Sequence, residues 1–194
     1  ASEGDRAALR RLPDASREAE LAQRAELVAL RARLERVPTR GLNGEDALNR
    51  AYLLRVIDQS VRAIDLDFGR APISNGDGYF SYGDYLAYTT PIQSADDAEA
   101  WLSRLEALPT LYQQSEVNAR RGIETGYTQP RIVIDRALDT ARAQVETLEN
   151  TLLTPLASMP SNIPAAQQEQ YRERARAIIR ERILPVHRQP VAFI

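Results

Sequence analysis

The sequence predicts an all-α protein of antiparallel helix hairpins or a helix bundle, interrupted by one long loop or short hairpin rich in Gly and Tyr. Apolar residues recur every three or four positions through most of the 194 residues, and these segments start at capping residues and stop at Gly or Pro. Residues 67–93 lack this period, so we expect them to be irregular. We expect a single helical domain or subdomain with helices at about 15–37, 45–66, 94–108, 110–125, 130–152 and 165–184.

Two apolar stripes predict the first two helices. In residues 15–37, leucines and valines recur among Glu and Arg, Asp14 or Ser16 is placed to cap the first turn, and Pro38 ends the segment. A glycine-containing turn at 41–44 leads into the second stripe. That stripe consists of Leu54, Ile57, Val61 and Ile64. Because the turn is short, we expect the two helices to pair as an antiparallel hairpin.

The stretch from Phe68 to Pro91 has the composition of a loop, with four glycines, two prolines and four tyrosines. It predicts a long loop or a short hairpin that turns at 75–78. Loops of this length tend to be functional or to pack on another element. Two interpretations stay open: a surface loop held by its tyrosines, or the rim of a ligand cleft or of a contact with a neighbouring domain.

Caps, Gly and Pro set the helix boundaries in the second half. Ser94 begins a capping box that has Asp97 in place of the usual Glu. The apolar stripe behind this cap consists of Trp101, Leu102, Leu105 and Leu108. Pro109 is expected to start the next helix, which should stop at Gly126 in the left-handed C-cap position. Pro130 is expected in the first turn of the helix after that.

The last helix is rich in Arg and Glu, and its end is unusual. Pro185 is expected to kink this helix without ending it, because apolar residues continue beyond it. The chain then stops inside an apolar run, Val191–Ile194. Natural C-termini are usually polar, so this ending favours a fragment of a larger helical protein, of which the chain is the N-terminal part.

The composition excludes several classes of protein. All 25 basic residues are arginine, there are 27 acidic residues, and the chain has no Cys and one His. Disulfides, Cys nucleophiles and P-loop lysines are therefore impossible within these residues, and a zinc site would have a single imidazole. A net charge of −2 argues against a nucleic-acid partner. No apolar run reaches the roughly 20 residues of a membrane span.

No residue stands out as catalytic or as a metal ligand. His187 is the only side chain that ordinarily titrates near neutrality, but no second His or Cys lies nearby, so we expect a packing role. Asp97 is more simply a helix cap, and the pair Asp65 and Asp67 has too few ligands for calcium. The Asn75–Gly78 segment resembles part of a calcium loop, but it lacks the bidentate Glu and is better explained as a turn.

The junction at residues 118–131 is the strongest candidate for binding. It places three arginines, two glycines and a tyrosine where two predicted helices meet. Guanidinium groups beside a helix start could hold a carboxylate. Arg120, Tyr127 and Arg131 are therefore the candidates for substrate binding. The alternative is a glycine-capped turn whose arginines pair with local Glu and Asp.

At this junction the sequence resembles a known family. Residues 90–136 carry a Thr-Pro before a capped helix, the segment Asp-Ala-Glu-Ala-Trp-Leu-Ser-Arg-Leu, a Leu-Pro, and Arg-Arg-Gly-Ile followed by Gly-Tyr-Thr-Gln-Pro-Arg. These features resemble the bacterial domain-of-unknown-function 885 family. The agreement extends upstream through LPDASREAE and LNGEDALNRAYLLRVID and downstream to ILPVHRQPVAFI, so it covers nearly the whole chain.

Members of that family are large, mostly helical bacterial proteins, often exported or lipid-anchored, and the resemblance implies a zinc metallopeptidase. The family's His-Glu-x-x-His motif lies in its C-terminal half and is absent here, so no catalytic residue carries over. By similarity, the present helices would form one wall of a substrate channel opposite the zinc half. The implied mechanism there is attack of a zinc-polarised water on a peptide carbonyl, with the motif's glutamate as general base.

We therefore expect a non-catalytic N-terminal helical region of a zinc-dependent peptidase. Its expected partners are the C-terminal catalytic half of the same chain, which would hold the zinc, and the parent's peptide substrate. Self-association through the exposed face is also expected. The expected location is the periplasm or a membrane anchor, with the cytoplasm as the alternative. The alternative function is a stand-alone protein-interaction module that uses Tyr79, Tyr82, Tyr85 and Tyr88.

Overall fold

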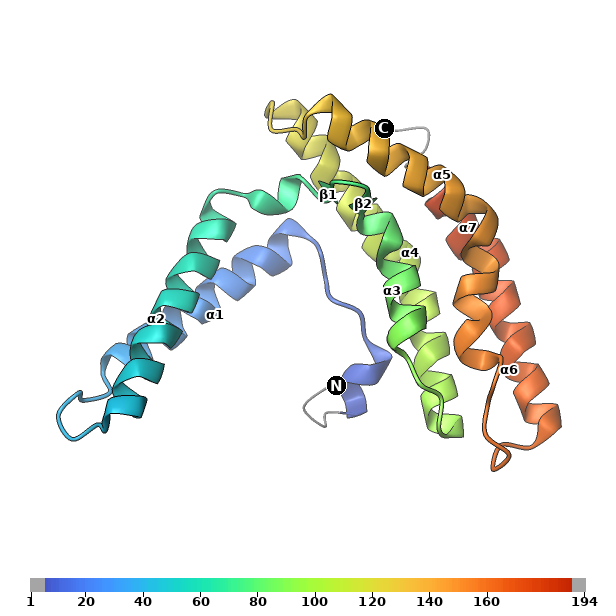
Figure 1. The fold of residues 1–194 in the computed structure, drawn as a ribbon, viewed down its shortest axis with the longest axis horizontal. Coiled ribbons are helices and arrows are strands. Elements are labelled where there is room, and N and C mark those ends of the chain that lie inside the picture. Colours follow the sequence, from blue (N-terminus) through green and yellow to red (C-terminus); the bar gives the residue numbers. More distant parts are fainter. Residues whose placement is uncertain (1–5, 190–194) are drawn as a thin grey trace. The chain divides into compact units, whose positions relative to one another are not determined.

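The computed structural model describes residues 6–189, which are mainly helical as predicted (Figure 1). The helices form two compact units, which we describe one at a time. One unit is continuous, from Ala15 to Arg70, and the other joins the residues up to Asp14 to the chain from Ala71 onward. No helix in the described part of the chain is both long and apolar enough to cross a membrane.

The Ala15–Arg70 unit is the helix hairpin that the two apolar stripes predict. Its helices are α1 (Arg17–Glu35) and α2 (Gly44–Asp65), and they pack on each other. Ser16 caps α1 and Asn43 caps α2, each through its side-chain oxygen. A short 3-10 turn at residues 68–70 ends the unit.

Two ion pairs across this hairpin show that its helices are antiparallel. Arg24 pairs with Asp65 at 2.5 Å and Arg31 with Asp58 at 2.6 Å, so the partner's number falls as the chain advances along α1. Among the described side chains of the unit, only Ile57 is fully buried. The large apolar residues that stay exposed on its two helices are Leu21, Val28, Leu30, Leu48, Tyr52, Leu53 and Val56. Self-association through such a face stays a prediction.

The Gly- and Tyr-rich stretch contains the short hairpin that its Asn-Gly turn predicts. Strands β1 (Ile73–Ser74) and β2 (Asp77–Gly78) pair antiparallel, with Ile73 opposite Gly78. Between them, Gly76 has a φ of 75° whereas Asn75 does not enter the positive region. In the four-residue turn 74–77, Gly76 is the third residue. A type II turn needs a positive φ at this position and not at the second, which explains the glycine.

Residues 95–124 form one continuous helix, α4 (Ala95–Glu124), so the expected division into helices at 94–108 and 110–125 is wrong. Pro109 lies in the helix interior, where its missing N–H and its ring cost about 3 kcal/mol. Side chains on both sides of it are buried: Leu105, Leu108, Leu111 and Tyr112. Packing along the whole buried face outweighs this local cost, because tertiary contacts supply most of the stability of helices in proteins.

The same stretch also contains a helix that the sequence analysis missed, α3 (Tyr82–Thr89), after a 3-10 turn at residues 79–81. The expectation of an irregular segment is therefore wrong here. A Cβ on Gly83 would lie 2.8 Å from the Tyr112 Oη and 3.2 Å from the Leu108 side chain. Gly83 thus lets α3 pack along α5 while it lies against side chains of α4, and this packing stabilises a helix that local composition does not predict.

Two further boundaries follow the predicted chemistry closely. The Ser94 Oγ accepts the Asp97 N–H at 3.2 Å, so Ser94 is the predicted N-cap, and the Asp97 carboxylate reaches back to accept from the Ser94 hydroxyl at 2.8 Å and from the Gln93 N–H at 3.1 Å. Helix α5 (Arg131–Leu153) begins one residue later than predicted, because Pro130 is its N-cap and not part of its first turn. A 3-10 turn at residues 154–156 follows α5.

Helix α4 packs on the last helices of the chain and α3 packs on α5, and side chains buried among these elements form the core of this unit (Figure 1). Two hydrogen bonds from its aromatic side chains tie the elements together. The Trp101 indole donates to the Leu152 carbonyl at 3.2 Å, and the Tyr112 hydroxyl donates to the Phe80 carbonyl at 3.1 Å. The largest fully buried side chains of this unit are Trp101, Tyr112, Phe80, Leu102, Leu105, Leu108, Leu148, Leu152, Leu156, Ile179 and Ile183.

The last helix changes its winding before Pro185. Helix α6 (Ala165–Ile178) passes into a π-helical turn (Ile179–Ile183), and α7 (Leu184–His187) completes it. The residue four positions before Pro185, whose carbonyl its ring would crowd in an α-helix, lies inside the π turn. The helix therefore continues beyond the proline, as expected. The apolar run Val191–Ile194 lies outside the described residues.

Candidate functional site

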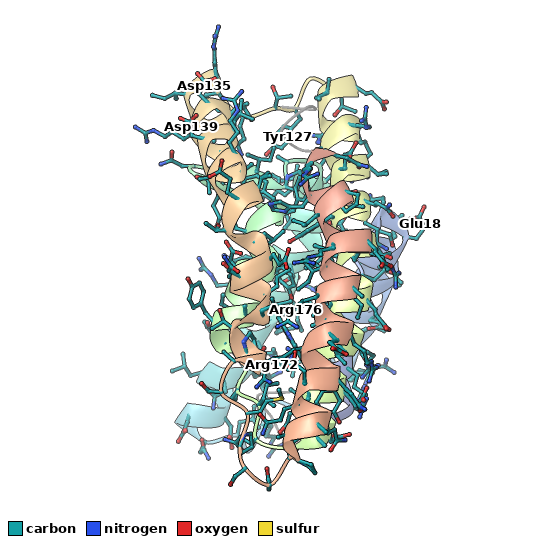
Figure 2. All side chains as sticks on the ribbon, turned by 90° about the vertical axis from the view of Figure 1, so that its right-hand side faces the viewer. Glu18, Tyr127, Asp135, Asp139, Arg172 and Arg176 are labelled. Atoms are coloured by element: carbon teal, nitrogen blue, oxygen red, sulfur yellow. The ribbon has the colours of Figure 1, made fainter. Side chains whose placement is uncertain are left out.

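The predicted junction is a glycine-capped corner between α4 and α5. Gly126, with a φ of 69°, donates its N–H to the Ile123 carbonyl at 3.1 Å, and Tyr127 donates its N–H to the Gly122 carbonyl at 2.8 Å. These two bonds form a Schellman motif, in which Gly126 is the left-handed residue. The predicted C-cap is therefore confirmed, and it fixes Tyr127 at the end of α4. Figure 2 shows Tyr127 between the ends of α4 and α5.

Replacing Gly126 by alanine should lower the free energy of unfolding by about 1 kcal/mol, because an L side chain is strained at a left-handed φ. A Cβ there would meet nothing within 4 Å, so crowding does not contribute. Gly126→Asn is the matched control, since Asn tolerates this conformation better. Urea denaturation followed by circular dichroism measures both variants. Equal losses for Ala and Asn would contradict the explanation.

The two candidate arginines lie on either side of the corner, and each has a local carboxylate partner. Arg120 contacts Glu116 at 2.5 Å on α4, and Arg131 contacts Asp135 at 3.6 Å on α5. These are the pairs expected of a glycine-capped turn. The side chains nevertheless remain 57% exposed for Arg120 and 93% exposed for Arg131, so both guanidinium groups are accessible. Exposed pairs of this kind contribute little to stability, so a ligand carboxylate can compete with them.

Large apolar side chains are exposed at the same corner, and sequence reasoning found only one of them. We call this set the corner patch: Val117, Ile123, Tyr127 and Ile132, which are 62%, 55%, 40% and 62% exposed. Val117, Arg120 and Ile123 are spaced by three along α4, so the apolar and cationic side chains lie on neighbouring positions of one surface. The sequence could have shown that Val117 and Ile123 are exposed, because their positions do not follow the three- and four-residue spacing of the buried α4 stripe.

The His187 side chain, considered above as a base or metal ligand, lies in the interior of its unit. Its side chain is 0% exposed, and its ring centroid is 5.6 Å from that of Tyr112. Neither imidazole nitrogen has a hydrogen-bond partner in the part of the chain that is described. Burial lowers the pKa of His187 to about 4. The residue is therefore neutral at pH 7 and packed away from any substrate, as expected of a packing role.

The tyrosines of the loop divide between the interior and the surface. Tyr79 is buried, with its ring 6.2 Å from that of Tyr112, and burial raises the pKa of both phenols. Tyr82 is half-buried, whereas Tyr85 and Tyr88 on α3 are 63% and 79% exposed. The four predicted tyrosines therefore do not form one exposed surface, because the first of them belongs to the core.

The carboxylates considered as metal ligands have other roles. Asp65 pairs with Arg24, and Asp67 pairs with Arg17 at 3.2 Å. In residues 6–189, no three His, Cys, Asp or Glu side chains gather as metal ligands do. With His187 buried against an aromatic ring, the described residues do not fit a zinc site.

Comparison with known families gives a match over nearly the whole chain. The family model described as "Bacterial protein of unknown function (DUF885)" matches residues 2–194. No curated protein and no solved structure matches the chain. The match covers both units of the structure, including the corner patch.

Proposed function

The chain belongs to DUF885, a family of bacterial proteins of unknown function, and from this premise we propose that it is the non-catalytic N-terminal helical region of a zinc-dependent peptidase. In this role it supplies scaffold and one wall of a substrate channel. The zinc and the residues that hold it would belong to a C-terminal half of the same chain. The proposed location is that of an exported protein, either in the periplasm or anchored to a membrane.

The observation that supports this proposal is the corner patch with its two accessible arginines. A peptide offers apolar side chains and carboxylates, and the patch offers exposed apolar area beside guanidinium donors. The Schellman motif holds these groups on the ends of two long helices, so little ordering is needed when a peptide binds. A rigid surface of mixed character is what a channel wall requires.

The described residues supply no step of peptide hydrolysis in this proposal. His187 is buried and neutral, and no accessible nucleophile–base pair is present among residues 6–189. Their contribution is to bind and orient the substrate. Variants in this region should therefore affect KM more than the chemical step.

The proposal is tested first in the gene and then by kinetics. The reading frame should continue beyond the codon for Ile194 to a His-Glu-x-x-His motif. In the full-length protein, Arg120→Ala, Tyr127→Ala and Arg131→Ala should each raise KM for peptides by about 3- to 10-fold, because each removes an interaction worth about 1 kcal/mol. Steady-state kinetics and thermal melting should show kcat and Tm near those of the wild type.

Arg142→Ala is the matched control for these variants. Its side chain is 59% exposed and pairs only loosely with Asp139, at 3.9 Å, so it resembles the candidate arginines but lies farther along α5. Its KM should equal that of the wild type. Unchanged KM values for all three corner variants would reject the channel wall, and a reading frame without the motif would reject the peptidase.

A further inference from the structure

Arg104 is a buried arginine on α4 that the proposed channel wall does not use. Its residue surface is 9% exposed, and its guanidinium carbon lies 5.2 Å from the centre of the Trp101 ring. Trp101 itself is 0% exposed. The guanidinium therefore covers the face of the indole, an arrangement in which the ring quadrupole attracts the cation.

The charge of Arg104 has no anionic partner in the part of the chain that is described. The residue forms no hydrogen bond and no ion pair there, and its Nε is sealed from solvent without an acceptor. Neither Asp84 of α3 nor Glu99 of α4 serves it: one oxygen of Asp84 accepts from Gln144 at 2.8 Å while the other is buried without a hydrogen-bond partner in the described residues, and Glu99 pairs with Arg174 at 2.7 Å. Burial lowers the pKa of Arg104. Buried charges in proteins are ordinarily paired with an opposite charge, so we expect an anion to bind beside the Arg104 guanidinium.

Tyrosines of α3 lie beside this unpaired charge. Gly83 brings α3 against Leu108, one turn along α4 from Arg104, and Tyr82 is close enough to Arg104 for each group to influence the pKa of the other. The Tyr82 and Tyr85 rings are 6.4 Å apart, and Tyr85 is 63% exposed. The place therefore combines guanidinium and phenol donors with accessible aromatic surface.

We propose that Arg104, Tyr82 and Tyr85 form a binding site for a carboxylate carried on an apolar or aromatic group. The carboxylate would accept from the terminal guanidinium nitrogens, which, unlike Nε, are not among the atoms sealed from solvent, and the apolar group would lie on the tyrosine rings. Such a carboxylate occurs on small aromatic acids and at the C-terminal residue of a peptide. The site is separate from the corner patch, so it stands or falls independently of the channel wall.

The test compares two probes with the same phenyl ring, phenylacetate, which carries a carboxylate, and phenylacetamide, which carries the neutral amide in its place. Trp101 is the single tryptophan of the chain and lies under Arg104, so its fluorescence reports on this site. Phenylacetate should change that fluorescence saturably, with an affinity at least about tenfold higher than that of phenylacetamide. Acetyl-Gly-Phe with a free or an amidated C-terminus distinguishes a small aromatic acid from the C-terminal residue of a peptide. If the peptide with the free C-terminus binds more tightly than phenylacetate, the natural ligand is a peptide end.

Arg104→Met keeps an apolar side chain over Trp101 and removes the charge. It should weaken phenylacetate binding about tenfold or more without lowering Tm. Tyr85→Ala should also weaken binding, and its exposure leaves the fold unaffected; Tyr88→Ala, 79% exposed on the same helix, is the control and should bind normally. Equal binding of both probes, binding of neither, or wild-type affinity in Arg104→Met and Tyr85→Ala would overturn the site. If Arg104→Met lowered the Tm and kept the wild-type affinity for phenylacetate, the role of Arg104 would be to pack on Trp101 and not to bind an anion.

Discussion

Replacing Trp101 by alanine should lower the free energy of unfolding of its unit by about 3–5 kcal/mol, the range for removing a fully buried large side chain. The indole is 0% exposed, so its removal leaves a cavity between α4 and the elements packed on it. The change also leaves the Leu152 carbonyl without its donor, which costs about a further 1 kcal/mol. Urea denaturation followed by circular dichroism at 222 nm measures the loss.

Two variants bracket this effect. Trp101→Phe keeps most of the buried volume and should lose clearly less than Trp101→Ala, while the hydrogen bond to Leu152 is lost in both. Tyr88→Ala removes a ring that is 79% exposed and should change stability by no more than about 0.5 kcal/mol. A Trp101→Ala loss below about 1 kcal/mol would contradict a core centred on α4.

The stability of the protein should fall as the pH is lowered from about 6.5 to about 4, through His187. Its pKa ordinarily lies near 6.5, and burial lowers it to about 4 in the folded chain. Between these values the unfolded chain binds a proton that the folded chain does not, so unfolding becomes easier with each unit of acidification. At about 1.4 kcal/mol per unit, the full loss is about 3 kcal/mol, and above pH 6.5 this contribution is constant.

His187→Leu isolates this effect from the carboxylates that titrate in the same range. Leucine fills a similar volume beside Tyr112 and cannot take up a proton, so the stability of the variant should vary less between pH 4 and 6.5. The measurement is the free energy of unfolding at half-unit intervals, and the difference between the two proteins is the contribution of His187. Parallel curves for the two proteins would show that the imidazole is not held neutral by burial.

Boundaries that depend on a single chemical group could be predicted from the sequence. The Ser94 capping box, the turn at Gly76 and the left-handed Gly126 each follow from one side chain or from the lack of one. The packing role of His187 followed from the absence of other ligands. In each case the residues that decide the structure lie within a few positions of one another along the chain.

Features that depend on distant contacts could not be predicted in this way. Pro109 looked like a helix start, but buried residues on both sides keep α4 continuous. Helix α3 forms because Gly83 fits under Tyr112, about thirty residues away, and no local pattern records that fit. Arg104 lies three positions after Trp101 and four before Leu108, on the buried face of its helix, but this spacing does not show that its charge stays without an anion, and only the fold shows its guanidinium over Trp101. The corner patch likewise became visible only when exposure was known.

The π-helical turn has a consequence for how the last helix meets its neighbours. Every fourth side chain along it is 0% exposed: Ala175, Ile179, Ile183 and His187. In an α-helix, residues four apart drift by about 40° per step, so such a line would wind away by about 120° over three steps. The wider π turn takes up part of this drift. The buried line therefore winds around the helix axis less than it would in an uninterrupted α-helix, and α4 contacts α6, the π turn and α7 in succession.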